Sequence, residues 1–437
     1  MRLTNVAQMD LVAGRVFSYG VSAGAEGRAL PVSFDQGLHV GAGQRPGSWM
    51  AIAFRLRAPV DRALVGAAWD AVVARHGTLQ TAFSTTDDGR LELHEIAVAP
   101  GAWIEHPVTE RRRTRDVLRE VFDEACAPYA RPSHRICLVE PDAGDDDPRP
   151  DLVIGSDHAH VDMWSLVILS AEVLACLADL EAGRAPGAAL PPATAFAEHT
   201  AVLAAMPAAP AEVHGRWAAI LEAGEGIMPR FPLPLGQLDP RPPEVVEVRD
   251  VLDAEESRRL AAVAKAAGVR PIAIGISVLT EVTQRLAGRP LRAVFPVHSR
   301  HEDRWRESIG WFITNAVIES ADPDPVASAA SVQEAIGLGS WPLAPILAAH
   351  GGGMPVAPGM FAVSWLDARR LPVPTAPGSQ LRYVSAAIRT DGVMIWFAVD
   401  ESGLHLRCRY PDTPEAREHV GRWLDAVQQG LRDRASG

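Results

Sequence analysis

One stretch decides how this chain folds: Ser156-Asp157-His158-Ala159-His160-Val161-Asp162-Met163-Trp164-Ser165. The apolar residues 151–155 before it predict a short buried strand, and residues 166–180 after it have the apolar spacing of a helix. A histidine at a strand-to-helix turn, with an aspartate four residues later, favours an imidazole held at a cleft. Histidine is the usual side chain for taking a proton from an attacking nucleophile, so His158 is the first candidate for a general base.

Composition limits the class of protein. At 437 residues the chain is long enough for two or three cores, and 47% hydrophobic with 22% charged residues is typical of a globular protein. A net charge of −12 argues against general binding to nucleic acid or to an anionic membrane. The four cysteines show no paired CxxC spacing, which favours reduced thiols. No signal pattern and no apolar run of about 18 residues is present, so we expect a cytoplasmic chain without a membrane span.

The order of the patterns predicts two halves that both mix helices and strands. The region rich in proline, alanine and glycine between them predicts a connection with one helix near residues 213–223. We therefore expect an N-terminal lobe at 1–182 that carries His158, a connecting region at 183–245 and a C-terminal lobe at 246–437. The clearest predicted elements are helices at 59–77, 114–125, 253–267, 271–287 and 414–431, and strands at 78–84, 90–98, 136–139, 291–297, 360–365, 393–399 and 405–410.

Several segments carry a resemblance to one family. His158-x-x-x-Asp162 resembles the His-His-x-x-x-Asp-Gly motif of nonribosomal-peptide condensation domains and related polyketide-associated acyltransferases. Two departures are visible: Asp157 stands where the family has its first histidine, and Met163 stands where it has glycine. Further segments resemble the family in the family's own order, at 31–36, 74–83, 292–300, 310–315 and 363–370.

The resemblance implies a fold and an activity. It implies an α/β (α+β) protein of two chloramphenicol-acetyltransferase-like lobes that form a V, with an active-site tunnel between them. The implied enzyme is a free-standing acyltransferase that forms an amide or ester in antibiotic or other natural-product biosynthesis. The acyl group would arrive as a phosphopantetheine thioester on an acyl or peptidyl carrier protein or on coenzyme A. A small amine or alcohol would accept it, and no bound cofactor or metal is implied.

The resemblance also assigns roles to single residues. His158 would be catalytic, while Asp162 would be structural and pair with Arg300 from the other lobe. Asp162 can also be read as an ordinary helix cap. The other residues predicted at the substrate tunnel are Asp157, His160, Met163, Trp164, Trp311, Asn315 and Ser364. Core packing explains Trp311 equally well, and a methionine at 163 would narrow the tunnel where the family has glycine.

Alternatives remain open from the residues alone. His158-x-His160-x-Asp162 also resembles the His-x-His strand end of metal-dependent hydrolases, in which two imidazoles on one face chelate one ion. A condensation-like protein that recruits partners without catalysis is a further possibility, because the motif is altered. The arginines at 111–115 would suit an acidic carrier protein, but a solvated arginine face explains them as well.

Overall fold

The computed structural model describes residues 2–371 and 380–436. It divides into two compact units, neither of which is one continuous stretch of chain. The first unit contains Met1–Met206, Arg300–Phe312 and Leu371–Ala387, and the second contains Pro207–Ser299, Ile313–Arg370 and Ile388–Gly437. This division of the chain differs from the predicted boundaries at 182 and 245. Composition does not reveal that the later segments Arg300–Phe312 and Leu371–Ala387 belong to the first unit. Arg300 in particular belongs to the first unit and not to the second.

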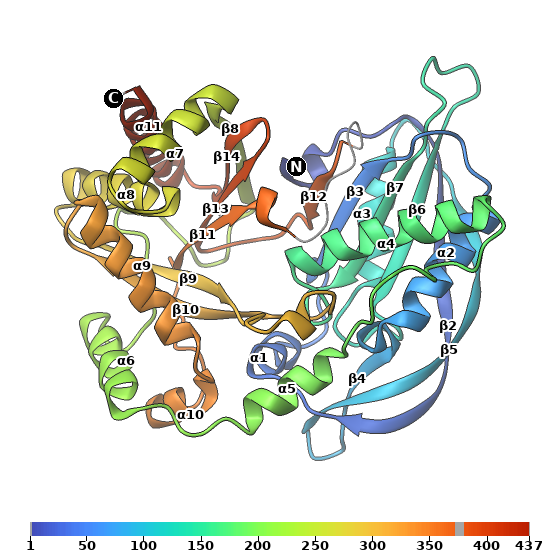
Figure 1. Cartoon of the computed structure of the whole chain (residues 1–437), viewed down its shortest axis with the longest axis horizontal. Helices are drawn as coiled ribbons and strands as arrows, with labels where there is room; N and C mark the ends of the chain where they lie inside the picture. The colour runs from blue at the N-terminus through green and yellow to red at the C-terminus, as the bar shows by residue number, and fades with distance from the viewer. Residues whose placement is uncertain (1, 372–379, 437) are drawn as a thin grey trace. The chain divides into compact units, whose positions relative to one another are not determined.

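A mixed sheet forms the centre of the first unit, with strand order β1-β12-β3-β7-β6-β2-β5-β4 (Figure 1). β12 pairs in parallel with β1 and antiparallel with β3, so a late segment of the chain completes the sheet. β7 lies between β3 and β6 and is buried along its whole length. The strands are β1 (Arg2–Asn5), β2 (Gly14–Leu30), β3 (Trp49–Arg55), β4 (Thr81–Thr85), β5 (Leu91–His106), β6 (His134–Pro141), β7 (Asp151–Asp157) and β12 (Arg382–Ser385).

Helices pack against this sheet and are capped by their own sequence. α3 contacts β2 and β6, and α4 contacts β3, β7 and α2. Ser33 and Gln36 form a reciprocal capping box at the start of α1, and the Asp162 side chain accepts from Ser165 N at the start of α4. The helices are α1 (Phe34–Gly41), α2 (Arg62–Arg75), α3 (Thr114–Ala125), α4 (Met163–Glu181) and α5 (Phe196–Ala204). α5 lies where only a connecting region was predicted.

The second unit repeats the mixture of strands and helices around its own sheet, with strand order β10-β9-β11-β13-β14-β8. Pro271 stands in the first turn of α8, and Gly288 ends the helix in the left-handed conformation, which are positions that proline and glycine favour. The strands are β8 (Glu244–Asp253), β9 (Leu291–His298), β10 (Ile313–Ser320), β11 (Phe361–Asp367), β13 (Val393–Asp400) and β14 (Gly403–Pro411). The helices are α6 (Ala211–Ala223), α7 (Ala254–Ala266), α8 (Pro271–Ala287), α9 (Pro325–Gly339), α10 (Leu343–Leu347) and α11 (Pro414–Ser436).

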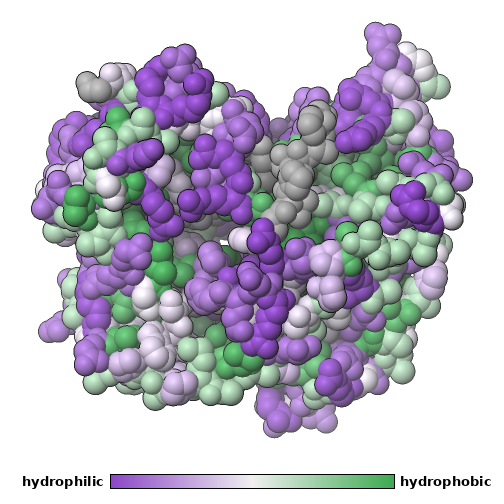
Figure 2. Space-filling view, viewed as in Figure 1, coloured by the Kyte–Doolittle hydropathy of each residue, from purple (hydrophilic) through white to green (hydrophobic). Residues whose placement is uncertain are grey.

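The sequence predicts a chain without a membrane span, and two features of the structure can be compared with that prediction: the outer surface and the most apolar helix. Polar side chains cover much of the face shown in Figure 2, with smaller apolar areas between them. By length and composition α4 could nevertheless cross a membrane, and α7 with α8 could do so only as a pair bent by 93°. α4 packs against β3, β7 and α2, which is how the core helix of a globular unit is placed.

Gly155 on β7 lies against the side chain of Phe122 from α3. A Cβ atom at this position would lie 2.6 Å from ring atoms of the buried Phe122. Gly155→Ala should therefore lower the free energy of unfolding by about 1–3 kcal/mol through overpacking, measured by urea denaturation. Gly215→Ala in α6 is the matched control, because its Cβ would meet nothing within 4 Å, and it should raise stability by up to about 1 kcal/mol. Equal effects of the two changes would show that Phe122 yields without strain.

Candidate active site

The residues between β7 and α4, 158–162, form a tight turn that we call the His158 turn. Asp157 Oδ1 accepts from Ala159 N at 2.9 Å, and His158 N donates to the Ser48 carbonyl at 3.1 Å. The His158 side chain closes the turn, because its Nδ1 donates to the Val161 carbonyl at 2.9 Å. A carbonyl can only accept, so this contact assigns the proton to Nδ1 and leaves the lone pair on Nε2. The local hydrogen bonds therefore prepare one ring nitrogen as a base.

The surroundings of His158 keep the imidazole neutral. Burial lowers the pKa of His158 to about 4, and the neighbouring His39 lowers it as well, while Asp157 acts in the opposite direction. At neutral pH the ring is therefore unprotonated and able to accept a proton. The ring therefore has no proton to lose from Nε2 before it accepts one there, although its lowered pKa makes it a weak base.

Asp162 and Arg300, which the sequence analysis expected to pair, form an ion pair at 3.0 Å in which both side chains are only 2% exposed. Both residues lie in the first unit. The Asp162 carboxylate also accepts from Ser165 N at 2.7 Å, from Ser165 Oγ at 2.6 Å and from Phe312 N at 3.2 Å. Arg300 donates to the carbonyls of Trp305 at 3.0 Å and Ser308 at 2.6 Å. Asp162 is thus both the predicted helix cap and the anchor of residues 300–312.

Residues 300–312 bring aromatic side chains onto the His158 turn. The Trp311 indole stacks on the His158 imidazole, with ring centroids 3.8 Å apart and planes at 14°. Gly310 precedes it in direct contact with α5, because a Cβ there would lie 2.4 Å from the Phe196 side chain. Ser165 Oγ accepts from Gly310 N at 3.0 Å and so joins α4 to this segment. The Gly-Trp-Phe sequence at 310–312 therefore has a steric reason for its glycine.

Sequence reasoning missed the contribution of α1. Gln36 Nε2 donates to the Ala159 carbonyl at 2.9 Å, and His39 Nε2 lies 3.1 Å from the buried Asp157 carboxylate. Arg45 holds His39 from the other side, through its ring Nδ1 at 3.0 Å and its carbonyl at 2.8 Å. The sequence at 31–36 indicates only the family resemblance and not these contacts. Gln36 and His39 are three positions apart, which places them on one helix face, and this spacing was the signal available in the sequence.

The remaining predicted site residues fall in different places. His160 is buried beside Thr81 and Phe83, with Nδ1 3.3 Å from the Thr81 hydroxyl. Met163 and Trp164 form the first turn of α4, where Trp164 Nε1 donates to the Arg306 carbonyl at 3.3 Å. Asn315 on β10 and Ser364 on β11 belong to the second unit. The predicted tunnel roles of all these residues stay predictions.

The metal alternative required His158 and His160 to face one ion. Instead, His158 Nδ1 donates to a backbone carbonyl, and His160 Nδ1 faces Thr81. In the part of the chain that the structure describes, no group of three or more His, Cys, Asp or Glu side chains is arranged to hold a metal ion. The geometry therefore offers no support for a His-x-His chelate at this turn.

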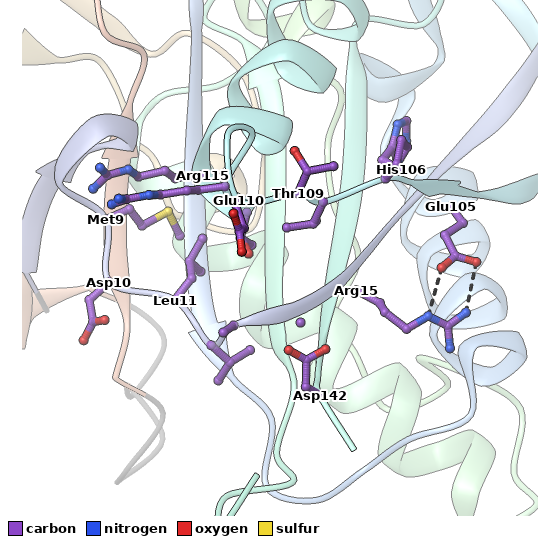
Figure 3. A pocket seen from close by; sticks show the side chains of 17 residues that line it. Met9, Asp10, Leu11, Arg15, Glu105, His106, Thr109, Glu110, Arg115 and Asp142 are labelled. Atoms are coloured by element: carbon purple, nitrogen blue, oxygen red, sulfur yellow. Dashed lines mark hydrogen bonds and ion pairs between the residues drawn. The ribbon is translucent and has the colours of Figure 1, made fainter. Parts of the chain in front are cut away.

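A cavity of about 700 Å³ opens elsewhere in the first unit, beside the start of α3 (Figure 3). Arg113 and Arg115 of the predicted arginine cluster line it, and the Arg15–Glu105 ion pair at 2.9 Å lies at its side. Acidic side chains also line it, so its charge is mixed: Asp10, Glu110 and Asp142. His158 is not among the described residues that line this cavity, and the cavity is separate from the site described above.

The buried pair predicts a large effect on stability. Asp162→Ala removes a helix cap and leaves the Arg300 guanidinium buried without its carboxylate, so the free energy of unfolding should fall by about 3–5 kcal/mol in urea denaturation. Asp253→Ala is the matched control, since Asp253 caps α7 in the same way but is exposed, and it should cost only about 0.5–2 kcal/mol. Similar losses in the two variants would mean that Asp162 acts only as a cap.

Known proteins resemble this chain in sequence and in fold. No protein-family model matches the chain. The acyltransferase PapA3 of Mycobacterium tuberculosis is 27% identical over 291 residues, which is 62% of this chain and 61% of the relative's length. The chain therefore matches less than two thirds of that relative.

Solved structures extend the similarity over nearly the whole chain. The PapA2 acyl transferase superposes with a TM-score of 0.86 at 22% identity and covers 100% of both chains. The first condensation domain of the calcium-dependent antibiotic synthetase superposes with a TM-score of 0.73 at 16% identity, over 94% of this chain and 97% of that one. These similarities confirm the predicted α/β fold and the resemblance that the motifs carried: the chain has the fold of the condensation-domain superfamily.

Proposed function

We propose that this protein is a condensation-type acyltransferase. It moves an acyl group from a pantetheine thioester, on a carrier protein or coenzyme A, to an amine or hydroxyl acceptor. The observation that carries the proposal is the state of His158, whose Nδ1 is occupied by the Val161 carbonyl and whose Nε2 keeps its lone pair at neutral pH. The similarity to Pap acyltransferases and condensation domains supports the same reaction class.

In the proposed mechanism His158 first takes a proton from the acceptor and then gives it to the leaving thiolate. Nε2 takes the proton of the acceptor as its oxygen or nitrogen forms a bond to the thioester carbonyl carbon. The tetrahedral intermediate then collapses, the carbon–sulfur bond breaks, and the thiolate takes the proton from the imidazolium. The products are an ester or amide and a free pantetheine thiol, so no cofactor, oxidant or metal is required. Asp162 and Arg300 do not take part in the chemistry but hold the segment that carries Trp311.

The first test of this function is removal of the base. His158→Ala should lower kcat for acyl transfer by about two to four orders of magnitude, the usual contribution of general-base catalysis. The assay follows thiol release and ester or amide formation from a panel of acyl thioesters with amine and alcohol acceptors. His94→Ala is the control, since His94 lies on β5 and pairs with Glu92, and it should retain activity. Full turnover by a folded His158→Ala variant would rule out His158 as the base.

The lowered pKa of His158 sets the expected pH dependence. A base works when unprotonated, so kcat/KM should be flat between about pH 6 and pH 8 and fall only as the pH drops toward the His158 pKa of about 4. An ordinary histidine would already lose activity below about pH 6.5. Circular dichroism across the same range checks that the fold persists. An acidic limb with its midpoint near pH 6.5 would contradict a His158 whose pKa is lowered and whose ring is neutral.

A further inference from the structure

Asp157 needs a hydrogen-bonding partner that the histidine of the family's motif would not need. Its side chain is fully buried, yet it carries a carboxylate where condensation domains have their first histidine. A buried charge is costly unless it is paired and hydrogen-bonded. Burial raises the pKa of Asp157, but hydrogen bonding, above all from His39, outweighs this and holds the pKa below its ordinary value. The carboxylate therefore depends on a partner from outside the motif.

That partner is His39, which comes from α1, 118 residues earlier in the chain. Its Nε2 lies 3.1 Å and 3.2 Å from the two carboxylate oxygens, so it reaches both. Arg45 donates to His39 Nδ1 at 3.0 Å, which makes Nδ1 an acceptor and assigns the remaining proton to Nε2. Arg45 also donates to the His39 carbonyl at 2.8 Å. The ring is thus fixed in orientation and in tautomer, with its N–H directed at Asp157.

The same carboxylate fixes the backbone beside His158. Asp157 Oδ1 accepts from Ala159 N at 2.9 Å, so the group that His39 holds also shapes the His158 turn. The His39 ring also lies near the two stacked rings. Its centroid is 5.2 Å from that of Trp311 and 6.0 Å from that of His158, and both contacts are edge-on. The charged and titratable groups around His158 are His39 from α1 and Asp157 from β7, and Arg45 and His160 act on these two.

We propose that His39 is a positioning residue for His158, acting through Asp157, in place of the first histidine of the family motif. The role rests on the proposed acyl transfer for its activity readout. His39 donates the hydrogen bond that keeps the Asp157 carboxylate in place, and this carboxylate keeps the His158 turn in the shape that presents Nε2. Arg45 contributes to the same positioning, because its hydrogen bond to His39 Nδ1 keeps the Nε2–H directed at Asp157.

Two substitutions at His39 separate hydrogen bonding from packing. Phe keeps the ring and its edge contact with Trp311 but has no N–H, whereas Gln has no ring but can place an amide N–H near the position of Nε2. His39→Phe should lower kcat about 100-fold with KM changed less than about threefold, the scale of a small displacement of a catalytic group. His39→Gln should stay within about threefold of the natural enzyme. Arg45→Met keeps His39 but frees its ring, and it should lower kcat by about tenfold.

A spectroscopic measurement tests the same idea without any substrate. Nitrogen-15 NMR of histidine-labelled protein should show the Nδ1–H tautomer for His158, assigned by its loss in His158→Ala. In His39→Phe the Nε2–H tautomer of His158 should appear beside it, while His39→Gln should keep the natural His158 signals and lose only those of His39 itself. If no thioester and acceptor give a product, the proposed function fails, but the tautomer shift still decides the role of His39.

Three results would overturn the proposal. Natural kcat together with an unchanged His158 tautomer in His39→Phe would show that Asp157 needs no donor from His39. A loss in His39→Gln that is larger than the loss in His39→Phe would show that ring packing, and not the hydrogen bond, is what His39 supplies. Equal losses in the two variants would show that the hydrogen bond alone does not account for the role of His39.

Discussion

A single buried carboxylate, Asp162, holds the site of this protein together. It accepts from the first turn of α4, from the backbone of Phe312 and from Arg300, which lies 138 residues away in the chain. Without this carboxylate, Ser165 N and Phe312 N would lose their acceptor and Arg300 would lose its counter-charge inside the buried site, so its removal is costly. The stacking of Trp311 on His158 therefore follows from an ion pair that never touches the imidazole.

Around this anchor the site is built so that little has to change when a substrate arrives. The Val161 carbonyl sets the position of the proton on His158, and the Asp157 carboxylate shapes the turn. From α1, Gln36 binds the Ala159 carbonyl of the turn and His39 binds the Asp157 carboxylate. A base whose orientation and protonation are already set loses no free energy to reorganisation during the reaction. Burial also makes His158 a weak base, which suits a proton transfer that is concerted with attack on an activated thioester.

The sequence predicted what depends on neighbours along the chain. The strand-to-helix turn at His158, the cap at Asp162 and the helices α2, α3, α7, α8 and α11 all have local signals, such as apolar spacing, capping residues and Pro271. The fold class and the pairing of Asp162 with Arg300 came from the family resemblance. The contact of His39 with Asp157 and the insertion of β12 depend on where distant segments meet, which no local pattern encodes. The surroundings of α5 are rich in alanine and proline and carry no clear apolar spacing, so the sequence predicts a connection there and not a helix.

The placement of β12 has a consequence for how the protein is made. Residues 382–385 pair with both β1 and β3, so this strand occupies an interior position of a sheet whose other members all precede residue 158. During synthesis, roughly 160 residues separate the end of the first long segment of that unit from its last one, which is roughly 8–32 s at about 5–20 residues per second. Until then β1 and β3 each present an unpaired edge on the ribosome, and the amino-terminal third of the chain is open to strand exchange with another nascent copy.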